Sequence, residues 1–494
     1  MSETNNNTNE NALSHLYLEP KRLFGRKQIF TDETEITSEN INAVVEQAYL
    51  EHLVNREDIN YLYKFYKGDQ PVLYKVKTIR PEINRKVVTN IANEIVAFKV
   101  GYTVGKPVQY IASVAGDDVS KAVALLNDMM RVEGKVTKDR ELVEWQMVCG
   151  TGYRLVLPKK RKGERVPFEF YTMNPCNTFV VYANDYTRKP LVAVSVREDK
   201  NYNVTFTAYT EEGFYTIKKG SGTFTRVPNP LNMIPIIEYP ANTARLGAFE
   251  TVLTLLNAVN EVDSNRLDSI EQFVQSLLVV YNAEFDEGVT ANEIRQSGMV
   301  QLKSTSENKA DLKVISEALD QTNTETLKKS LINMIHEIVG MPSQGDGSTG
   351  DSSNGVAVVL KNGWQGAETR AEDYEAMFNE PERKFLSIVS FICDSQGSVV
   401  FDPYDIDVKF TRRNYEALLQ KSQTLTTLLA SDWVHPRNAY EASGLFVDSE
   451  EAYQMGASFH EEQKKEAMEN AETFTSGRTE SNSDGDTADT DSNE

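Results

Sequence analysis

Cysteine, histidine and tryptophan are scarce in this sequence, which has 3, 5 and 3 of them among 494 residues. Cys149, Cys176 and Cys393 are far apart and form no C-x-x-C pair, so we expect reduced core thiols and no disulfide framework. The five histidines are scattered, and they give no metal-binding pattern. We therefore expect no metal site, and we find no cofactor-binding motif.

Long apolar runs and an excess of positive charge are also missing. No apolar run approaches the ~18 residues of a membrane span, and the first fifteen residues lack the basic and apolar regions of a signal peptide. The formal net charge of −21 argues against tight DNA binding, which needs clustered Lys and Arg, although it leaves loose passage of DNA open. Hydrophobic residues make up 40%, so most of the chain should be globular.

Catalytic motifs are absent or broken. The stretch "HEIVG" begins like H-E-x-x-H, but Gly340 stands where the second histidine should be. The stretch "GYTVGKPV" resembles a phosphate loop, but its glycines are one residue too close and Pro107 replaces the Ser/Thr. We expect no catalytic residues and no enzyme.

The first half of the chain predicts an α+β region. Residues 1–35 are polar and are expected to form a mobile arm, and residues 36–246 hold helices near 82–99, 118–131 and 136–148. Six β-rich runs follow at hairpin distances: "YRLVLP", "FEFYTM", "TFVVYA", "LVAVSVR", "YNVTFTAYT" and "GFYTIKK". They predict an antiparallel sheet with helices packed on it.

Residues 247–283 lack proline and predict one long helix of about 50 Å. Polar side chains recur along it at steps of 3 and 4: Glu250, Thr254, Asn257, Glu261, Asn265, Asp268 and Gln272. The pattern fits an ordinary amphipathic helix with its polar face in solvent, or a face reserved for a more specific contact.

The second half divides into shorter segments. A compact insert with a helix "TANEIRQSG" and two strands is expected at 284–319. The later segments are a helix at 320–342, a Gly/Ser/Asp-rich loop at 343–355, a long helix kinked or interrupted at Pro381 and a strand within 356–412, two or three helices at 413–473, and a disordered acidic tail at 474–494.

The loop contains a formal G-x-G-x-x-G at Gly345, Gly347 and Gly350. A dinucleotide-binding loop follows a strand, whereas this one follows the helical pattern that stops at Gly340 and Pro342. The sequence therefore disfavours a nucleotide site and leaves a flexible linker as the plain alternative.

A basic cluster stands between two predicted strands. It consists of Lys159, Lys160, Arg161 and Lys162. These side chains fit a solvated hairpin tip, or a basic contact to DNA or to an acidic partner.

Four stretches in order resemble the portal proteins of tailed bacteriophages, specifically the long-tailed siphophage type. They are "YLYKFYKGDQPVLYK" (61–75), "INRKVVTNIANEIVAFKVGYTVGKPVQY" (83–110), "NPCNTFVVYANDYTRKPLVAVSVRED" (174–199) and "IPIIEYPANTARLGAFETVLTLLNAVNEVDSNRLDSI" (234–270). The resemblance runs from about residue 40 to about residue 470. The N-terminal extension and the acidic tail fall outside it.

The resemblance implies a multi-domain portal fold. Its β-rich wing would be residues 36–246, with a return strand in 356–412. Its stem would be the helices at 247–283 and 320–342, with the small α/β clip at 284–319 between them. The helical crown would be residues 413–473.

The resemblance also implies a function. A dodecameric ring at one capsid vertex would carry double-stranded DNA, without sequence specificity, during packaging, retention and ejection. The ring would dock the terminase large subunit and the head-completion or adaptor proteins, and would contact the major capsid and scaffolding proteins. The protein would lie in the virion, and in the host cytoplasm during assembly, without a membrane.

Residues 343–355 would then be a tunnel loop around the DNA. Its expected channel-lining residues are Gly345, Asp346, Gly347, Ser348, Gly350, Asp351, Ser352 and Asn354, and the expected channel-facing stem residues are Glu250, Asn257, Glu261 and Asp268. A channel through which DNA slides should not hold phosphate, and neither set contains Lys or Arg. The rival hypotheses are a scaffold without a channel and, less favoured, a nucleotide-driven DNA translocase.

Overall fold

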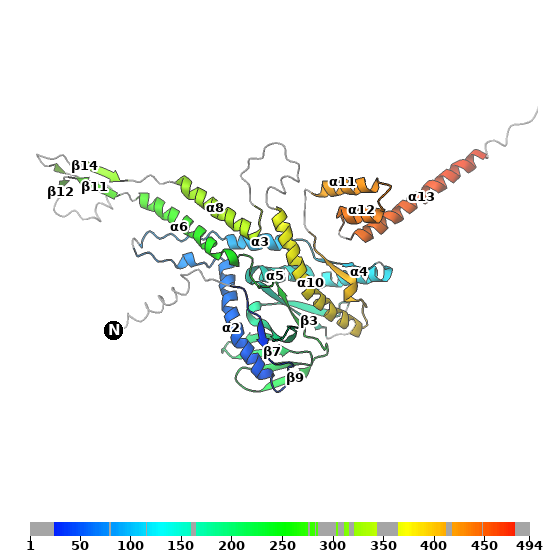
Figure 1. Ribbon diagram of the computed structural model, residues 1–494, viewed down its shortest axis with the longest axis horizontal. Helices are drawn as coiled ribbons and strands as arrows, with labels where there is room; N and C mark the ends of the chain where they lie inside the picture. Colours follow the sequence, from blue (N-terminus) through cyan, green and yellow to red (C-terminus); the bar gives the residue numbers. More distant parts are fainter. Residues whose placement is uncertain are drawn as a thin grey trace, which may run out of the picture.

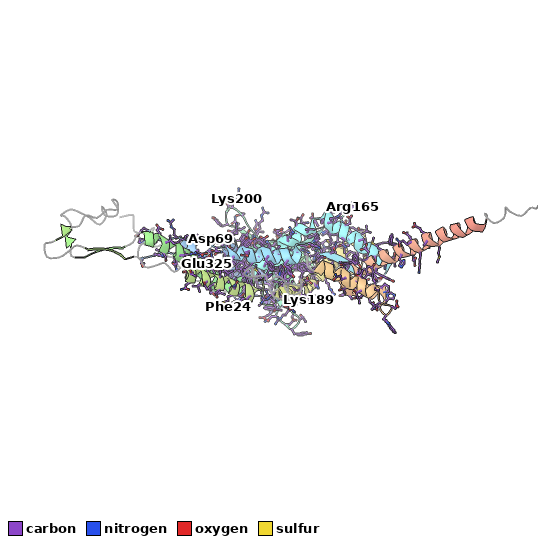
Figure 2. The ribbon with its side chains drawn as sticks, turned by 90° about the horizontal axis from the view of Figure 1, so that it is seen from above. Phe24, Asp69, Arg165, Lys189, Lys200 and Glu325 are labelled. Atoms are coloured by element: carbon purple, nitrogen blue, oxygen red, sulfur yellow. The ribbon has the colours of Figure 1, made fainter. Side chains whose placement is uncertain are left out.

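The structure is a computed structural model, and its layout is shown in Figure 1. It describes residues 24–78, 81–114, 116–159, 165–274, 277–281, 283–284, 303–304, 311–315, 321–342, 364–411, 417–446 and 448–479. An α+β body occupies the centre, and helices project from it at opposite ends. Figure 2 shows that the molecule is long and flat when it is seen from above.

Two sheets form the β part of the body. The larger sheet has the order β1 (Ile29–Thr31), β5 (Thr178–Ala183), β6 (Pro190–Glu198), β7 (Val204–Tyr209), β8 (Gly213–Lys218) and β9 (Phe224–Pro228). The smaller sheet has the order β10 (Ile236–Pro240), β3 (Thr151–Pro158) and β4 (Phe168–Met173). Each of the six β-rich runs contains a strand, and the pairs are antiparallel except that β1 lies parallel to β5. The predicted mixture of helix and antiparallel sheet is confirmed.

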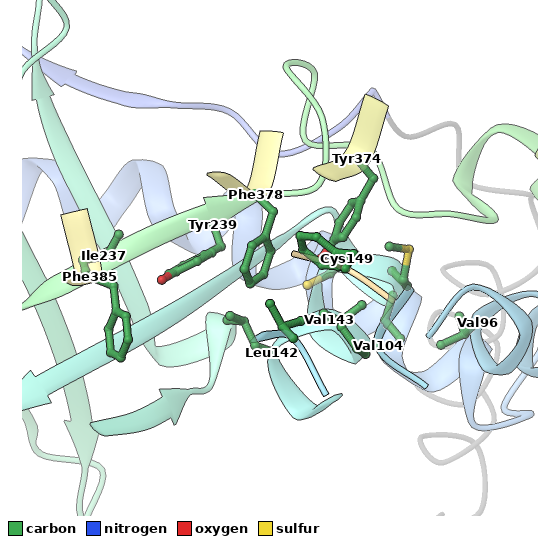
Figure 3. Close-up of a cluster of buried hydrophobic side chains, with 14 of the residues drawn as sticks. Val96, Val104, Leu142, Val143, Cys149, Ile237, Tyr239, Tyr374, Phe378 and Phe385 are labelled. Carbon is green, nitrogen blue, oxygen red and sulfur yellow. The ribbon is translucent and has the colours of Figure 1, made fainter. Parts of the chain in front are cut away.

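Three helices pack on these sheets: α2 (Ile41–Tyr66), α5 (Lys135–Cys149) and α10 (Trp364–Ser395). Two more helices extend the body, since α3 (Ile91–Val104) packs on α5 and α4 (Asp117–Val132) on the strand β2 (Gln109–Ala112) and on α5. The helix α2 packs on the larger sheet, where the rings of Tyr49 and Phe206 lie 5.0 Å apart. Figure 3 shows Tyr374, Phe378 and Phe385 of α10 in the main core with Leu142 of α5.

Two boundaries in the body differ from the sequence prediction. The helix expected at 82–99 begins only at Ile91, because the residues before it are extended and bind another helix, as described below. The helix α10 runs without a break through Pro381, so the predicted alternative of an interruption is wrong, while the alternative of a kink stays a prediction. Phe378 and Phe385 are both fully buried, and this packing holds the helix on either side of the proline.

The expected mobile arm at 1–35 also needs correction. Residues 1–23 lie outside the described residues, but residues from Phe24 onward belong to the body. The guanidinium of Arg26 donates to the Glu250 carboxylate at 2.7 Å, and Ile29 is buried in β1. A buried ion pair and a paired strand both fix this segment.

The longest projection consists of α6 (Leu253–Val274) and α8 (Gln321–Val339). The single helix expected at 247–283 is shorter, because its first turn is a 3-10 helix at Glu250–Val252 and its end is a strand, β11 (Leu277–Tyr281). The run "LLVVY" is rich in β-branched and aromatic residues, which favours a strand. It pairs with β14 (Asp311–Ile315).

Little of the 284–319 insert is described. The short strands β12 (Ala283–Glu284) and β13 (Lys303–Ser304) pair with each other, and β13 and β14 fall within the two predicted strands. The predicted helix "TANEIRQSG" lies outside the described residues.

At the other end of the body lie α11 (Ala417–Leu429), α12 (Pro436–Ser443) and α13 (Ser449–Thr479), as Figure 1 shows. These are the helices expected within 413–473, but α13 continues to Thr479, into the segment expected to be disordered. The expected strand after α10 is β15 (Ile406–Lys409), which pairs with β2 (Gln109–Ala112).

Candidate functional site

The projecting helices α6 and α8 lie side by side (Figure 1). Two ion pairs join them: Arg266 to Glu325 at 2.6 Å and Lys328 to Asp263 at 2.9 Å. Near the body, Ile335 of α8 is completely buried. The two helices therefore form one paired projection, which we call the stem.

The predicted polar stripe on the stem is only partly exposed. Glu261 is exposed, whereas the carboxylate of Glu250 is buried and accepts hydrogen bonds from the backbone N–H groups of Gly25 and Gly247 as well as from Arg26. The amide of half-buried Asn257 has no hydrogen-bond partner among the described residues. The Glu250 carboxylate is bound inside the body, so the prediction that it belongs to an exposed stripe is wrong.

Asp268 is buried as well, because residues 81–90 lie across the stem. We call residues 81–90 the strap. The backbone N–H groups of alternate strap residues donate to α6 side chains: Arg85 to Asp268 Oδ1 at 2.6 Å, Val87 to Ser264 Oγ at 3.0 Å, and Thr89 to Asn260 Oδ1 at 2.8 Å. Two residues of extended chain span about 6.6 Å and four residues of helix about 6 Å, so the two repeats match.

Ion pairs reinforce the end of this contact at Asp268. Lys77 binds Asp268, and the Arg85 side chain binds Glu271 at 2.8 Å. Burial alone would raise the pKa of Asp268, but the hydrogen bonds from Lys77 and from the Arg85 N–H outweigh it and lower that pKa. Asp268 therefore holds the strap as a carboxylate, and the prediction that it is exposed on the stem is wrong.

Asn260 and Ser264 are functional residues that the sequence reasoning missed. Both side chains are fully buried, and each accepts a strap N–H. The available signal was the spacing of three short hydrogen-bonding side chains, Asn260, Ser264 and Asp268, at i, i+4 and i+8. The predicted stripe followed a different line of residues and shared only Asp268 with this one.

The stem also carries apolar side chains that are exposed in the described part of the chain. On α8, Leu327, Met334 and Ile338 are 52%, 45% and 41% exposed, at helical spacings of 7 and 4. On α6, Leu267 and Ile270 are 44% and 41% exposed. We call these five side chains the apolar seam. A projecting helix pair with such a face is typical of a contact surface for another chain.

The expected tunnel-loop residues, Gly345 through Asn354, lie outside the described residues. The segment that leads to this loop is described: α8 ends at Val339, and Gly340 has a φ of 69°. The N–H of Met341 donates to the His336 carbonyl at 2.8 Å, which closes the helix with a Schellman motif. The predicted helix stop is confirmed, and the loop follows a helix rather than the strand that a dinucleotide fingerprint requires.

The basic cluster lies after β3, as expected. Lys159 donates to Glu133 Oε1 of α4 at 2.5 Å, so its charge is already paired within the chain. Lys160, Arg161 and Lys162 lie outside the described residues. A basic contact to DNA or to an acidic partner therefore stays a prediction for these three.

A buried charge cluster fixes α10, the helix that follows the loop. Arg154 of β3 donates to Glu382 at 3.0 Å, and Lys135 of α5 lies 3.1 Å from the same carboxylate. Tyr110 and Tyr239 also donate to Glu382, at 2.6 Å and 2.8 Å. Burial raises the pKa of Glu382, but these partners outweigh it and lower that pKa to about 2.

No metal-binding or membrane-spanning arrangement occurs in the described part of the chain. Groups of three or more His, Cys, Asp or Glu side chains placed to hold a metal ion are absent from it. No helix within it has both the length and the apolar character needed to cross a bilayer.

The fold is that of an elongated α+β protein with a projecting helix pair. A family model described as "Phage portal protein, SPP1 Gp6-like" matches residues 48–482. The chain therefore belongs to the SPP1 Gp6-like family of phage portal proteins. No curated protein sequence matches it.

Two solved structures are similar in fold. One is a chain in the neck of an empty GTA particle computed with C6 symmetry, and the other a chain in the neck of a native GTA particle computed with C12 symmetry. Each is 13% identical over 72% of this chain and 90% of the other, with TM-scores of 0.41 and 0.38.

Proposed function

We propose that this portal protein assembles into a ring-shaped channel at one capsid vertex, through which double-stranded DNA is packaged, retained and ejected. The observation that carries the proposal is the stem, whose apolar seam no part of the single described chain covers. In a ring the seam of each copy meets its neighbour, and association is favoured because it removes this apolar surface from water. We propose twelve copies, the number that the portal resemblance implies.

The channel would pass DNA loosely. The net charge is −21, and residues 343–355 contain no Lys, Arg or apolar side chain. Each phosphate that a protein neutralises adds salt-dependent affinity, so a loop without cations would let the duplex slide. On the stem, Glu261 is exposed and Asn257 is half-buried, and both remain our candidates for the channel face.

We assign partners by position along the chain. The clip at 284–319 would dock the terminase large subunit, and later the head-completion or adaptor proteins, because it stands between the two stem helices along the chain. The crown at 413–473 would face the capsid interior, and the major capsid and scaffolding proteins would surround the ring. The protein would reside in the virion and, during assembly, in the host cytoplasm. We propose no catalytic role and no cofactor.

A scaffold that organises the same partners without passing DNA is the alternative. Such a scaffold would also need a seam for self-association, so substitutions in the seam would not distinguish it from a channel. Substitutions in the loop at 343–355 would. Replacing Ser348 and Ser352 with Lys in a packaging-competent particle would place two rings of cations around the DNA. Packaging should slow, and the effect should weaken as salt rises.

The matched control replaces the same two serines with Asn, which keeps the loop polar and uncharged. This variant should package at the wild-type rate. If the lysine variant also packages normally at every salt concentration, the loop does not surround DNA and the scaffold is favoured.

A further inference from the structure

A cavity of about 530 Å³ lies where α3, the end of α8 and the start of α10 meet. Its size is that of a small organic ligand or a few side chains. Most of its wall is apolar and comes from these helices, from α5 and from the segment before the stem: Phe98, Tyr102, Met147, Leu246 and Met377. The cavity shares Ile338 with the apolar seam, but the proposed channel function assigns it no ligand.

Three charged residues line it: Lys99 of α3, and Arg370 and Asp373 of α10. Neither cation forms an ion pair with a described residue, and Arg370 lies against Gly340, where an added Cβ would be 2.4 Å from its Cδ. Burial and the nearby charge of Arg370 lower the pKa of Lys99 to about 8. A carboxylate bound to Lys99 would raise that pKa, so Asp373 does not neutralise it.

Arg370 and Asp373 are exposed to solvent where they border the cavity, whereas Lys99 is half-buried. A ligand carboxylate placed between Lys99 and Arg370 would pair with both cations and relieve the repulsion between them. Inorganic phosphate would leave the apolar walls of the cavity unfilled. The apolar walls require that the rest of the ligand be apolar.

We propose that this cavity binds a carboxylate carried on an apolar body, with the Lys99 ammonium and the Arg370 guanidinium as its partners. Such a group has two sources, a free organic acid or a Glu or Asp flanked by apolar residues on another copy of this chain. Both present the same chemistry to the cavity.

The test uses 3-phenylpropionate as the probe and the unassembled full-length chain, with binding measured by titration calorimetry. Wild type should bind it, and Lys99→Met and Arg370→Met should each bind about 10- to 100-fold more weakly, because a hydrogen bond to a charged group is worth about 1.5–3 kcal/mol. The control Lys200→Met, at an exposed turn, should match wild type. Inorganic phosphate should bind more weakly than the probe.

Melting temperatures show that each variant is folded. Lys99→Met keeps the length of the side chain and removes a half-buried charge that no carboxylate pairs, so it should melt no lower than wild type. Absence of binding to the wild-type chain would overturn the proposal, and so would equal binding by the folded Lys99→Met variant.

Repeating the titration on assembled particles identifies the source. Loss of probe binding on assembly assigns the carboxylate to another copy, and retained binding assigns it to a free acid. Neither result depends on whether DNA passes through the particle.

Discussion

At the scale of the residue, Glu382 is the side chain on which the position of α10 depends most. It lies fully buried one residue after Pro381 and contacts groups from α5, β2, β3 and β10. A buried pair adds little when it is complete, but the loss of one member leaves the other charge uncompensated in the interior. The helix that leads out of the loop is therefore sensitive to this single carboxylate.

Glu382→Gln should destabilise the folded chain by about 3–5 kcal/mol in urea unfolding, because Arg154 and Lys135 would keep only the Asp139 carboxylate and one buried positive charge would be uncompensated. Glu380→Gln is the matched control on the same helix, since Glu380 forms an exposed pair with Lys384. That change should be within about 0.5 kcal/mol of wild type. Equal effects of the two substitutions would contradict the assignment.

The same carboxylate predicts a pH dependence. The pKa of Glu382 is lowered from its ordinary 4.5 to about 2, so its contribution is complete above pH 4.5 and declines as pH falls toward 2. The stability difference between wild type and Glu382→Gln should therefore narrow from pH 6 to pH 3 in urea unfolding. A difference that stays constant over this range would show that Glu382 titrates normally.

At the scale of the element, the strap explains where sequence reasoning succeeded and failed. The β-strands were predictable because alternation of side chains is a local pattern, and the stop at Gly340 because a glycine after a helix is a local signal. The late start of α3 could not be predicted from the sequence. It depends on hydrogen bonds from Arg85 and Thr89 to α6 residues that are 183 and 171 positions away along the chain.

The site followed the same rule. The order of the segments of the candidate site along the chain could be predicted, and so could the end of α8 before the loop, because both depend on local sequence. Which polar residues between 250 and 268 face inward could not be predicted, because Glu250, Asn260 and Asp268 are bound by segments far away in the sequence. The lining of the cavity is a product of the same long-range packing.

Ser264→Ala tests the strap directly. It leaves the N–H of Val87 without its acceptor, which should cost about 1–2 kcal/mol of local stability. Hydrogen exchange at Val87 should then be about 5- to 30-fold faster, while amides in the β-sheets are unchanged. Thr254→Ala, at an exposed position of the same helix, serves as the control. Unchanged exchange at Val87 would mean that the strap does not rely on this contact.

At the scale of the whole molecule, the proposal of a ring depends on the apolar seam. The double substitution Met334→Glu and Ile338→Glu places charge on the seam, and it should prevent assembly while leaving the melting temperature near that of wild type, because both side chains are already exposed. Lys329→Glu also adds negative charge to α8 but lies outside the seam, and it should still assemble. Sedimentation velocity distinguishes the assemblies. Normal assembly of the double variant would exclude the seam as the contact.

The most direct test of the account is electron microscopy of the purified full-length chain. Viewed down the axis, the particles should be rings with a central hole, and the stems of neighbouring copies should touch. Single chains at all concentrations, or closed particles without a hole, would contradict the claim that this portal protein forms a channel.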